Sequence, residues 1–200
     1  MSAPRLLWRQ PSGGRRIRHL LAAVAILLST AGASGCLVLN LNPAYDDDTI
    51  AWDPDLLGSW VDADDKSSIE IERGEWKSYR VRYTHPVETG VLTGYLTVLG
   101  DRRFLDVMPL KGEDRGSFVI PGHAVLRVER VGDRLDLTPL SYDWFADRIR
   151  AGTPVPGLSA ALDQKENTLV VSPTSVLRSW LRTQPPDGPM FGAGATFTRK

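Results

Sequence analysis

The stretch GSWVDADDKSSIEIERGEWKSYRVRYTH, residues 58–85, decides the fold class because apolar and polar side chains alternate along it. Residues 68–72 alternate strictly, and Arg73-Gly74-Glu75 then has the composition of a turn. In the segment that follows, three largely apolar side chains share one face: Tyr79, Val81 and Tyr83. A period of two is typical of strands with one buried face, so the stretch predicts consecutive antiparallel strands.

The same pattern continues on both sides of this stretch. Further strands are predicted at 58–61, 92–98, 104–108, 124–129, 135–137, 169–171 and 195–198. The apolar faces of three of them contain Leu92, Gly94 and Leu96, then Ala124, Leu126 and Val128, then Leu135 and Leu137. Short links between such strands favour a mainly β fold, an antiparallel barrel or sandwich of eight or nine strands.

Two short helices interrupt the strands. Ser141 is a predicted N-cap for a helix from Tyr142 to about Ala151, which Gly152 ends. Ser172-Pro173 has the sequence of an N-cap followed by the first helical position of a second helix. Its predicted apolar stripe consists of Val176, Leu177, Trp180 and Leu181.

The charges of the 200-residue chain are unevenly distributed. Lys and Arg number 24 and Asp and Glu also number 24, but residues 1–36 hold five arginines and no acid. The remainder therefore carries 19 basic and 24 acidic residues, a net charge of −5. A mildly acidic domain is a poor partner for nucleic acid, and a single cysteine excludes a multi-cysteine metal site. We expect no cofactor and no metal.

The N-terminus has the three parts of a signal peptide: a basic region to Arg18, an apolar run over 20–28, and small residues before the sole cysteine, Cys36. Ser34-Gly35-Cys36 resembles the lipobox of bacterial lipoproteins, although Ala33 replaces the usual leucine. The resemblance implies cleavage before Cys36, acylation of Cys36 and attachment to a membrane. Two alternatives remain: cleavage after Ala33, which would release a soluble protein, and an uncleaved anchor over 20–41.

The predicted organisation is a signal peptide at 1–35, a lipidated cysteine and tether at 36–55, and a β-barrel domain at 56–200. Asn, Pro and the acidic triplet Asp46-Asp47-Asp48 break any periodicity in the tether. Because Leu37 is not an aspartate, the resemblance implies the outer membrane, facing the periplasm, in a Gram-negative cell. In other cells it implies the outer face of the cytoplasmic membrane.

Gly58-Ser59-Trp60 begins the predicted barrel and Arg199 follows its last strand. This G-x-W motif with a late arginine resembles the calycin superfamily of lipocalins and related barrels. The resemblance implies that Trp60 closes one end of the barrel and that Arg199 stacks on its indole ring, a contact with a sound physical basis. The two helices are not in the simple lipocalin order, so an open or modified barrel remains an alternative.

Candidate catalytic groups are few. His85 and His123, both expected at strand ends, are candidate general bases of a hydrolase, but no nucleophile motif or metal-ligand spacing accompanies them. We expect a non-enzymatic lipoprotein that binds a small apolar or amphipathic ligand in a barrel. The alternative is a structural or assembly lipoprotein that binds another envelope protein. A hollow barrel favours the first, and a filled barrel with an exposed apolar patch favours the second.

Overall fold

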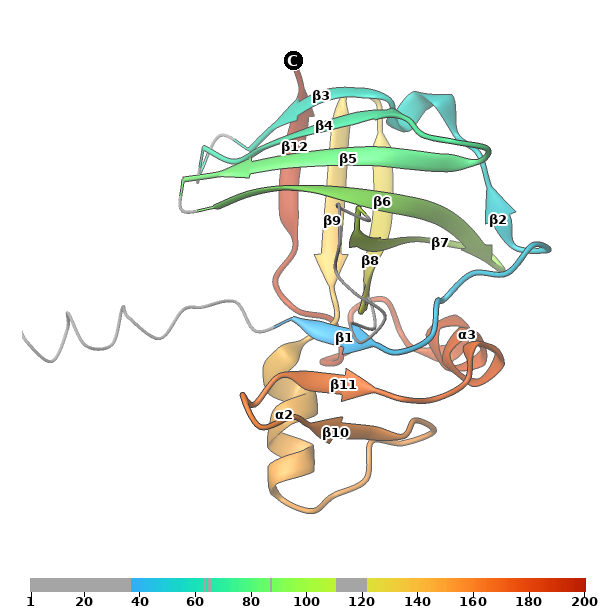
Figure 1. The fold of residues 1–200 in the computed structure, drawn as a ribbon, viewed down its shortest axis with the longest axis vertical. Coiled ribbons are helices and arrows are strands. Elements are labelled where there is room, and N and C mark those ends of the chain that lie inside the picture. Colours follow the sequence, from blue (N-terminus) through green and yellow to red (C-terminus); the bar gives the residue numbers. More distant parts are fainter. Residues whose placement is uncertain (1–36, 63, 65, 87, 111–121) are drawn as a thin grey trace, which may run out of the picture. The chain divides into compact units, whose positions relative to one another are not determined.

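Eight antiparallel strands close into a barrel in the part of the chain that the computed structural model describes (Figure 1). That part comprises residues 37–110 and 122–200, except for residues 63, 65 and 87. The predicted signal peptide and Cys36 therefore lie outside the described residues. The barrel strands are β3 (Gly58–Val61), β4 (Ser68–Arg73), β5 (Ser78–His85), β6 (Glu88–Leu99), β7 (Arg102–Pro109), β8 (His123–Val131), β9 (Arg134–Pro139) and β12 (Ala195–Arg199).

Each barrel strand from β3 to β9 pairs with the next one along the chain, and β12 closes the ring between β9 and β3. The two-residue alternation explains which side chains face inward. On β4, Ile69 and Ile71 are buried whereas Glu70 and Glu72 are exposed, and Ile71 lies opposite Val81 of β5. The predicted mainly β fold with an antiparallel barrel and two helices is confirmed, and the barrel is closed.

The predicted tether at 36–55 is wrong for the residues that the structure describes, because they belong to the folded unit. Strand β1 (Val38–Asn40) pairs antiparallel with β8 and parallel with β11 (Thr168–Val170). Strand β2 (Ile50–Ala51) pairs with β6, and β10 (Ala160–Leu162) extends the sheet beyond β11. Strands of two or three residues are too short to show a two-residue period in the sequence. The polar Asn40 is nevertheless buried, and its amide nitrogen donates to the His123 carbonyl at 3.3 Å.

Both predicted helices are present, as α2 (Tyr142–Arg150) and α3 (Thr174–Thr183). The Ser141 hydroxyl caps α2 by accepting from the Trp144 N–H at 3.3 Å. The N-cap of α3 is Pro173 and not Ser172, whose hydroxyl instead accepts from the Ser159 N–H at 2.8 Å. Ser172 therefore ties the loop before β10 to the start of α3.

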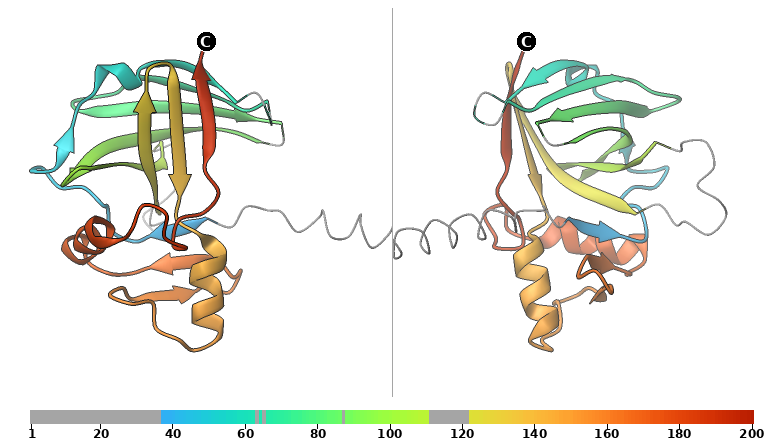
Figure 2. Two further views of the ribbon diagram at one scale, coloured as in Figure 1. Left: turned by 180° about the vertical axis from the view of Figure 1, so that it is seen from behind. Right: turned by 60° about the vertical axis from the view of Figure 1, so that its left-hand side comes forward.

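The chain builds two apolar cores. One lies inside the barrel and includes Leu56, Trp60 and Phe197. The other lies outside it, where the outward-facing Phe104 and Val125 meet Phe145 of α2 and both Leu177 and Leu181 of α3. In Figures 1 and 2, the helices, β10 and β11 lie below the barrel, with β1 between them and the barrel strands. The second core leaves the barrel interior free of helices α2 and α3.

Candidate functional site

One end of the barrel is closed by the short 3-10 helix η1 (Pro54–Leu56), which precedes β3. Leu56 and Trp60 are both buried, with exposed fractions of 1% and 0%. The Trp60 indole N–H donates to the Leu56 carbonyl at 3.0 Å. This bond satisfies the polar atom of the indole, so the whole ring serves as an apolar plug.

Gly58, Trp60 and Arg199, the residues of the sequence motif, meet at this closed end. The Arg199 guanidinium carbon lies 4.2 Å from the centre of the Trp60 ring. The same guanidinium donates to the carbonyls of Leu57 at 2.7 Å and Asp55 at 2.6 Å. Gly58 has a φ of +130°, and a Cβ there would lie 2.7 Å from Arg199 Nη1. A side chain at 58 would therefore strain the backbone and displace the guanidinium.

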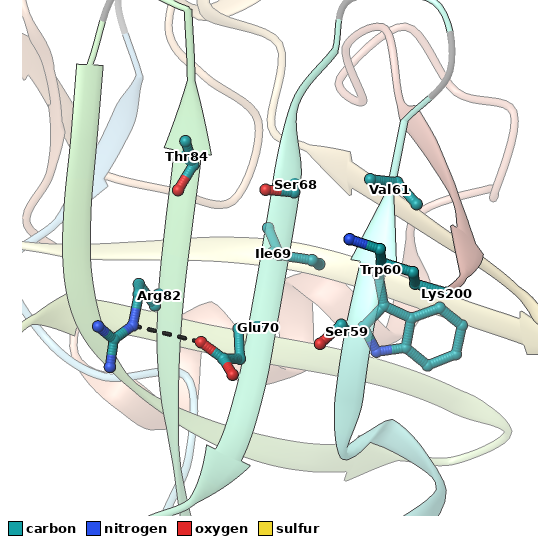
Figure 3. A pocket seen from close by; sticks show the side chains of 9 residues that line it. All are labelled: Ser59, Trp60, Val61, Ser68, Ile69, Glu70, Arg82, Thr84 and Lys200. Carbon is teal, nitrogen blue, oxygen red and sulfur yellow. Dashed lines mark ion pairs between the residues drawn. The ribbon is translucent and has the colours of Figure 1, made fainter.

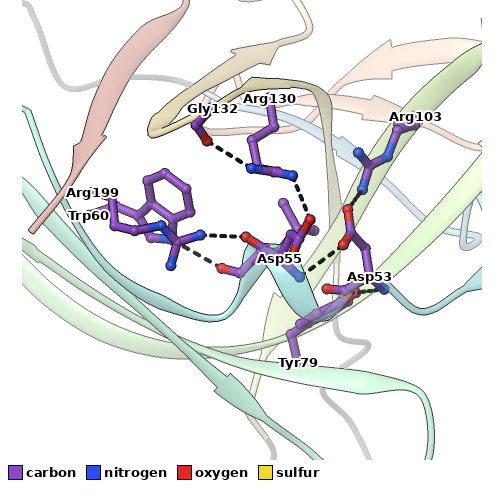
Figure 4. Close-up of polar contacts among 9 residues, drawn as sticks. Asp53, Asp55, Trp60, Tyr79, Arg103, Arg130, Gly132 and Arg199 are labelled. Atoms are coloured by element: carbon purple, nitrogen blue, oxygen red, sulfur yellow. Dashed lines mark hydrogen bonds and ion pairs between the residues drawn. The ribbon is translucent and has the colours of Figure 1, made fainter.

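Two further arginines seal the same end from the inside of β7 and β8 (Figure 4). Arg103 pairs with Asp53, and Arg130 Nη2 lies 2.6 Å from Asp55 Oδ2. The Tyr79 hydroxyl accepts from the Asp53 N–H at 2.7 Å and donates to its carbonyl at 3.1 Å. Burial raises the pKa of Tyr79, so its hydroxyl keeps its proton. This end is thus held by polar bonds around a tryptophan plug.

The other half of the barrel contains a cavity of about 470 Å³. Its wall is formed by inward-facing residues of β4 to β9, by Leu39 of β1 and by Leu37, which directly precedes β1. The lining consists of Leu37, Leu39, Ile69, Ile71, Val81, Tyr83, Leu92, Leu105, Val107, Pro109, Gly122, Ala124, Leu126 and Leu137. No side chain in this described lining is charged. Such a wall suits the apolar body of a ligand.

Small residues keep this space open. A Cβ on Gly94 would lie 3.2 Å from the Leu105 side chain and 3.5 Å from that of Val107. Ala124 places only a methyl group on the wall. Toward the open end the lining comes from the end of β7 at Pro109, from Gly122 before β8, and from Leu37. No described residue plugs this end as η1 plugs the other.

The two candidate catalytic histidines do not line the cavity. His85 is the last residue of β5 and is half-buried. His123, 7% exposed, faces the outer wall, where its Nδ1 lies 2.7 Å from Asp106 Oδ1. Asp106 Oδ2 accepts from the Ala44 N–H at 2.6 Å, so this buried pair fastens the segment after β1 to the barrel. In the described residues its geometry is that of a structural brace.

Two surface grooves are weaker candidates for a ligand site than the cavity. One of about 240 Å³ on the outside of β3, β4 and β5 contains the Arg82–Glu70 ion pair, whose side chains are about half exposed (Figure 3). The other, of about 460 Å³, contains Arg102, Arg103, Arg127 and Arg130. Each of these four guanidiniums already contacts a protein carboxylate or carbonyl. Neither groove matches the cavity as a site prepared for a ligand.

The alternation of the sequence indicated most of the cavity wall, because the apolar faces of 79–83, 92–96, 124–128 and 135–137 all point inward. Leu37 and Leu39 were missed, since the segment that carries them was assigned to a tether. The Asp106–His123 pair was also missed. A buried Asp within the apolar run Phe104 to Val107 is the signal that could have indicated it.

Fold and site define a closed β-barrel with an internal apolar cavity. Comparisons of the chain with models of protein families, with curated proteins and with solved structures found no match. Within the described residues, no group of three or more His, Cys, Asp or Glu side chains is arranged to hold a metal ion. No helix in the described ranges has both the length and the apolarity needed to cross a membrane.

Proposed function

We propose that this protein is a membrane-anchored envelope lipoprotein whose lipocalin-like barrel binds a small apolar or amphipathic ligand. The observation that carries the proposal is the apolar cavity of about 470 Å³, closed at one end by Trp60 and η1. Ligand sites in proteins typically measure about 300–1,000 Å³ and are lined mainly by apolar side chains. The meeting of Gly58, Trp60 and Arg199 supports the lipocalin-like part of the proposal.

The anchor rests on the lipobox-like sequence at Cys36. Two or more acyl chains on that residue would hold the protein permanently at a membrane, since each buried methylene contributes about 0.8 kcal/mol. The destination is the outer membrane, facing the periplasm, in a Gram-negative cell, or the outer face of the cytoplasmic membrane otherwise. Metabolic labelling with a radioactive fatty acid should label the wild type and not Cys36→Ser. Equal label on both proteins would refute the anchor.

Ligand binding is tested with a long-chain fatty acid that carries a photoreactive diazirine. After irradiation of the lipidated protein in vesicles, we expect adducts on peptides that contain Leu105 and Leu126, and excess unlabelled fatty acid should suppress them. Ala124→Phe should abolish the adducts because its ring would fill the cavity. Val131→Phe is the matched control, since Val131 lies on the same strand but is 79% exposed. Adducts that persist in Ala124→Phe would show that the cavity is not the site.

The alternative, a structural lipoprotein that binds another envelope protein, predicts a different outcome. It requires no ligand, so no competitive adduct should form in the cavity. The hollow barrel favours ligand binding, because a protein that used only its surface would gain stability from a filled interior. Hydrolysis by His85 or His123 is not part of the proposal, because neither side chain reaches the cavity wall.

A further inference from the structure

The open end of the cavity lies beside the proposed lipid attachment site. Leu37 and Leu39 both line the cavity. Cys36 directly precedes Leu37 in the sequence, and the Cα atoms of neighbouring residues are about 3.8 Å apart. An acyl chain attached to Cys36 would therefore start next to the mouth of the cavity.

Only Leu37 lies between the proposed anchor, Cys36, and strand β1. Leu39 pairs with Ala124 of β8, and Val38 pairs with Thr168 of β11. The Leu41 N–H donates to the Val170 carbonyl at 2.8 Å, so the strand is held on both sides. A free tether would let the domain take any orientation at a membrane. A chain that enters the sheet at Val38, two residues after its proposed anchor, fixes which face is close to the bilayer.

The side of the open end nearest to the proposed anchor is apolar. Two leucines near the open end are exposed to solvent, Leu37 by 49% and Leu110 by 40%. The closed end also exposes Val131, but the charged side chains of Asp53, Asp55, Arg103, Arg130 and Arg199 gather there. Strand β8 runs from the open end, beside Gly122, to the closed end, where Arg130 pairs with Asp55, so the two ends lie at opposite ends of the barrel. Burying apolar side chains at the bilayer interface lowers the free energy, whereas charged side chains lose favourable hydration there.

We infer that the face around the open end, formed by Leu37, Leu39, Pro109 and Leu110, docks onto the lipid bilayer, and that the cavity takes one acyl chain directly from it. This inference rests on the proposed anchor at Cys36. The described cavity wall offers no charged partner, so a fully enclosed carboxylate or phosphate headgroup would be costly. With the mouth on the membrane, the headgroup of a single-chain lipid stays at the interface while its chain enters the barrel.

The test uses the full lipidated protein in vesicles made of phospholipids with brominated acyl chains, which quench nearby fluorophores. In the lipidated protein the Cys36 sulfur would be in a thioether, so one introduced cysteine is the unique reactive thiol. Leu110→Cys and Val131→Cys, at the open and closed ends, are each labelled with bimane; both positions are exposed. We expect the probe at 110 to lose most of its fluorescence in brominated vesicles and the probe at 131 to keep it.

Weak quenching at both positions, or stronger quenching at 131, would overturn the inference. The inference would also be overturned if the fluorescence at 110 changed with the number of protein molecules per vesicle and not with bromination of the lipid. A second copy of the chain would then cover this face. Fatty-acid adducts in the cavity combined with an unquenched probe at 110 would leave ligand binding intact and refute the docking alone. Failure of the protein to co-sediment with vesicles would refute the anchor, and the docking with it.

Discussion

The closed and open halves of the barrel use the same strands for opposite purposes. In the closed half Leu96, Leu135 and Phe197 are buried around Trp60 and fill the interior. In the open half other inward-facing residues of the same strands, such as Leu92 and Leu137, border the cavity. Alternation therefore decides which side chains face inward, but their size and the presence of a plug decide whether the interior is filled.

The two halves are also braced differently. At the closed end the polar contacts of Asp53 and Asp55 lie inside the ring of barrel strands. At the open end the interior is a cavity, and the brace is outside, where Asp106 joins His123 to the Ala44 N–H. This arrangement leaves the cavity wall apolar while the N-terminal segment is still held. It also predicts that changes in the two halves will affect stability unequally.

The largest expected effect is at the plug. Trp60→Ala should lower the free energy of unfolding by about 3–5 kcal/mol, the usual cost of truncating a buried aromatic side chain. Trp76→Ala is the control, because Trp76 is 60% exposed and should change stability by less than about 0.5 kcal/mol. Guanidinium chloride melts measure both. A Trp60→Ala variant as stable as Trp76→Ala would contradict the role of Trp60 as the plug.

A pair of leucines on β9 compares the halves within one strand. Leu135 is fully buried, and Leu137, two residues later on the same face, borders the cavity and is only partly buried. Leu135→Ala should cost about 2–5 kcal/mol and Leu137→Ala clearly less, because its side chain loses fewer contacts. The same melts provide the measurement. Equal losses would mean that the open half is packed as tightly as the closed one.

The outer brace should have an intermediate effect. Asp106→Ala leaves the buried Ala44 N–H without its acceptor and His123 without its partner, which should cost about 1–3 kcal/mol. Asp101→Ala, in the turn before the same strand, is the control because the Asp101 side chain is 95% exposed. Thermal melts of the two variants decide the point. A neutral Asp106→Ala would show that the brace does not hold the N-terminal segment.

The smallest effect concerns Tyr45, which lies against Tyr95 on this outer wall with ring centres 4.4 Å apart. Burial, with Asp106 and Tyr95 adding to it, raises the pKa of Tyr45 to about 12 from its ordinary 10.0. As pH rises from 10 to 12 the unfolded chain loses this proton first, so the folded state loses stability. Tyr45→Phe should lose less stability over that range in denaturant melts. Identical pH profiles for the two proteins would show that Tyr45 titrates alike in both states.

Much of this comparison could be predicted from the sequence, and part of it could not. Strict alternation in 68–72 and 78–83 is a local signal, so the barrel strands and their inward faces followed directly. Strand β1 has only three residues, and its partners at 123–124 and 168–170 are distant in sequence, so no local pattern indicates it. The cavity depends on the combined sizes of residues from six strands and β1, which pairing alone does not reveal.

The central claim, that the open half is a site for an acyl chain, is tested most directly by a crystal structure with a long-chain fatty acid brominated at its terminal carbon. Ile71 and Leu105 lie on the part of the cavity wall toward the closed end, and Tyr83 and Pro109 lie nearer the open end. The account predicts an anomalous bromine peak beside Ile71 and Leu105, with the carboxylate at the open end. A bromine found only on the outer surface, or an interior closed by the protein's own side chains, would contradict it.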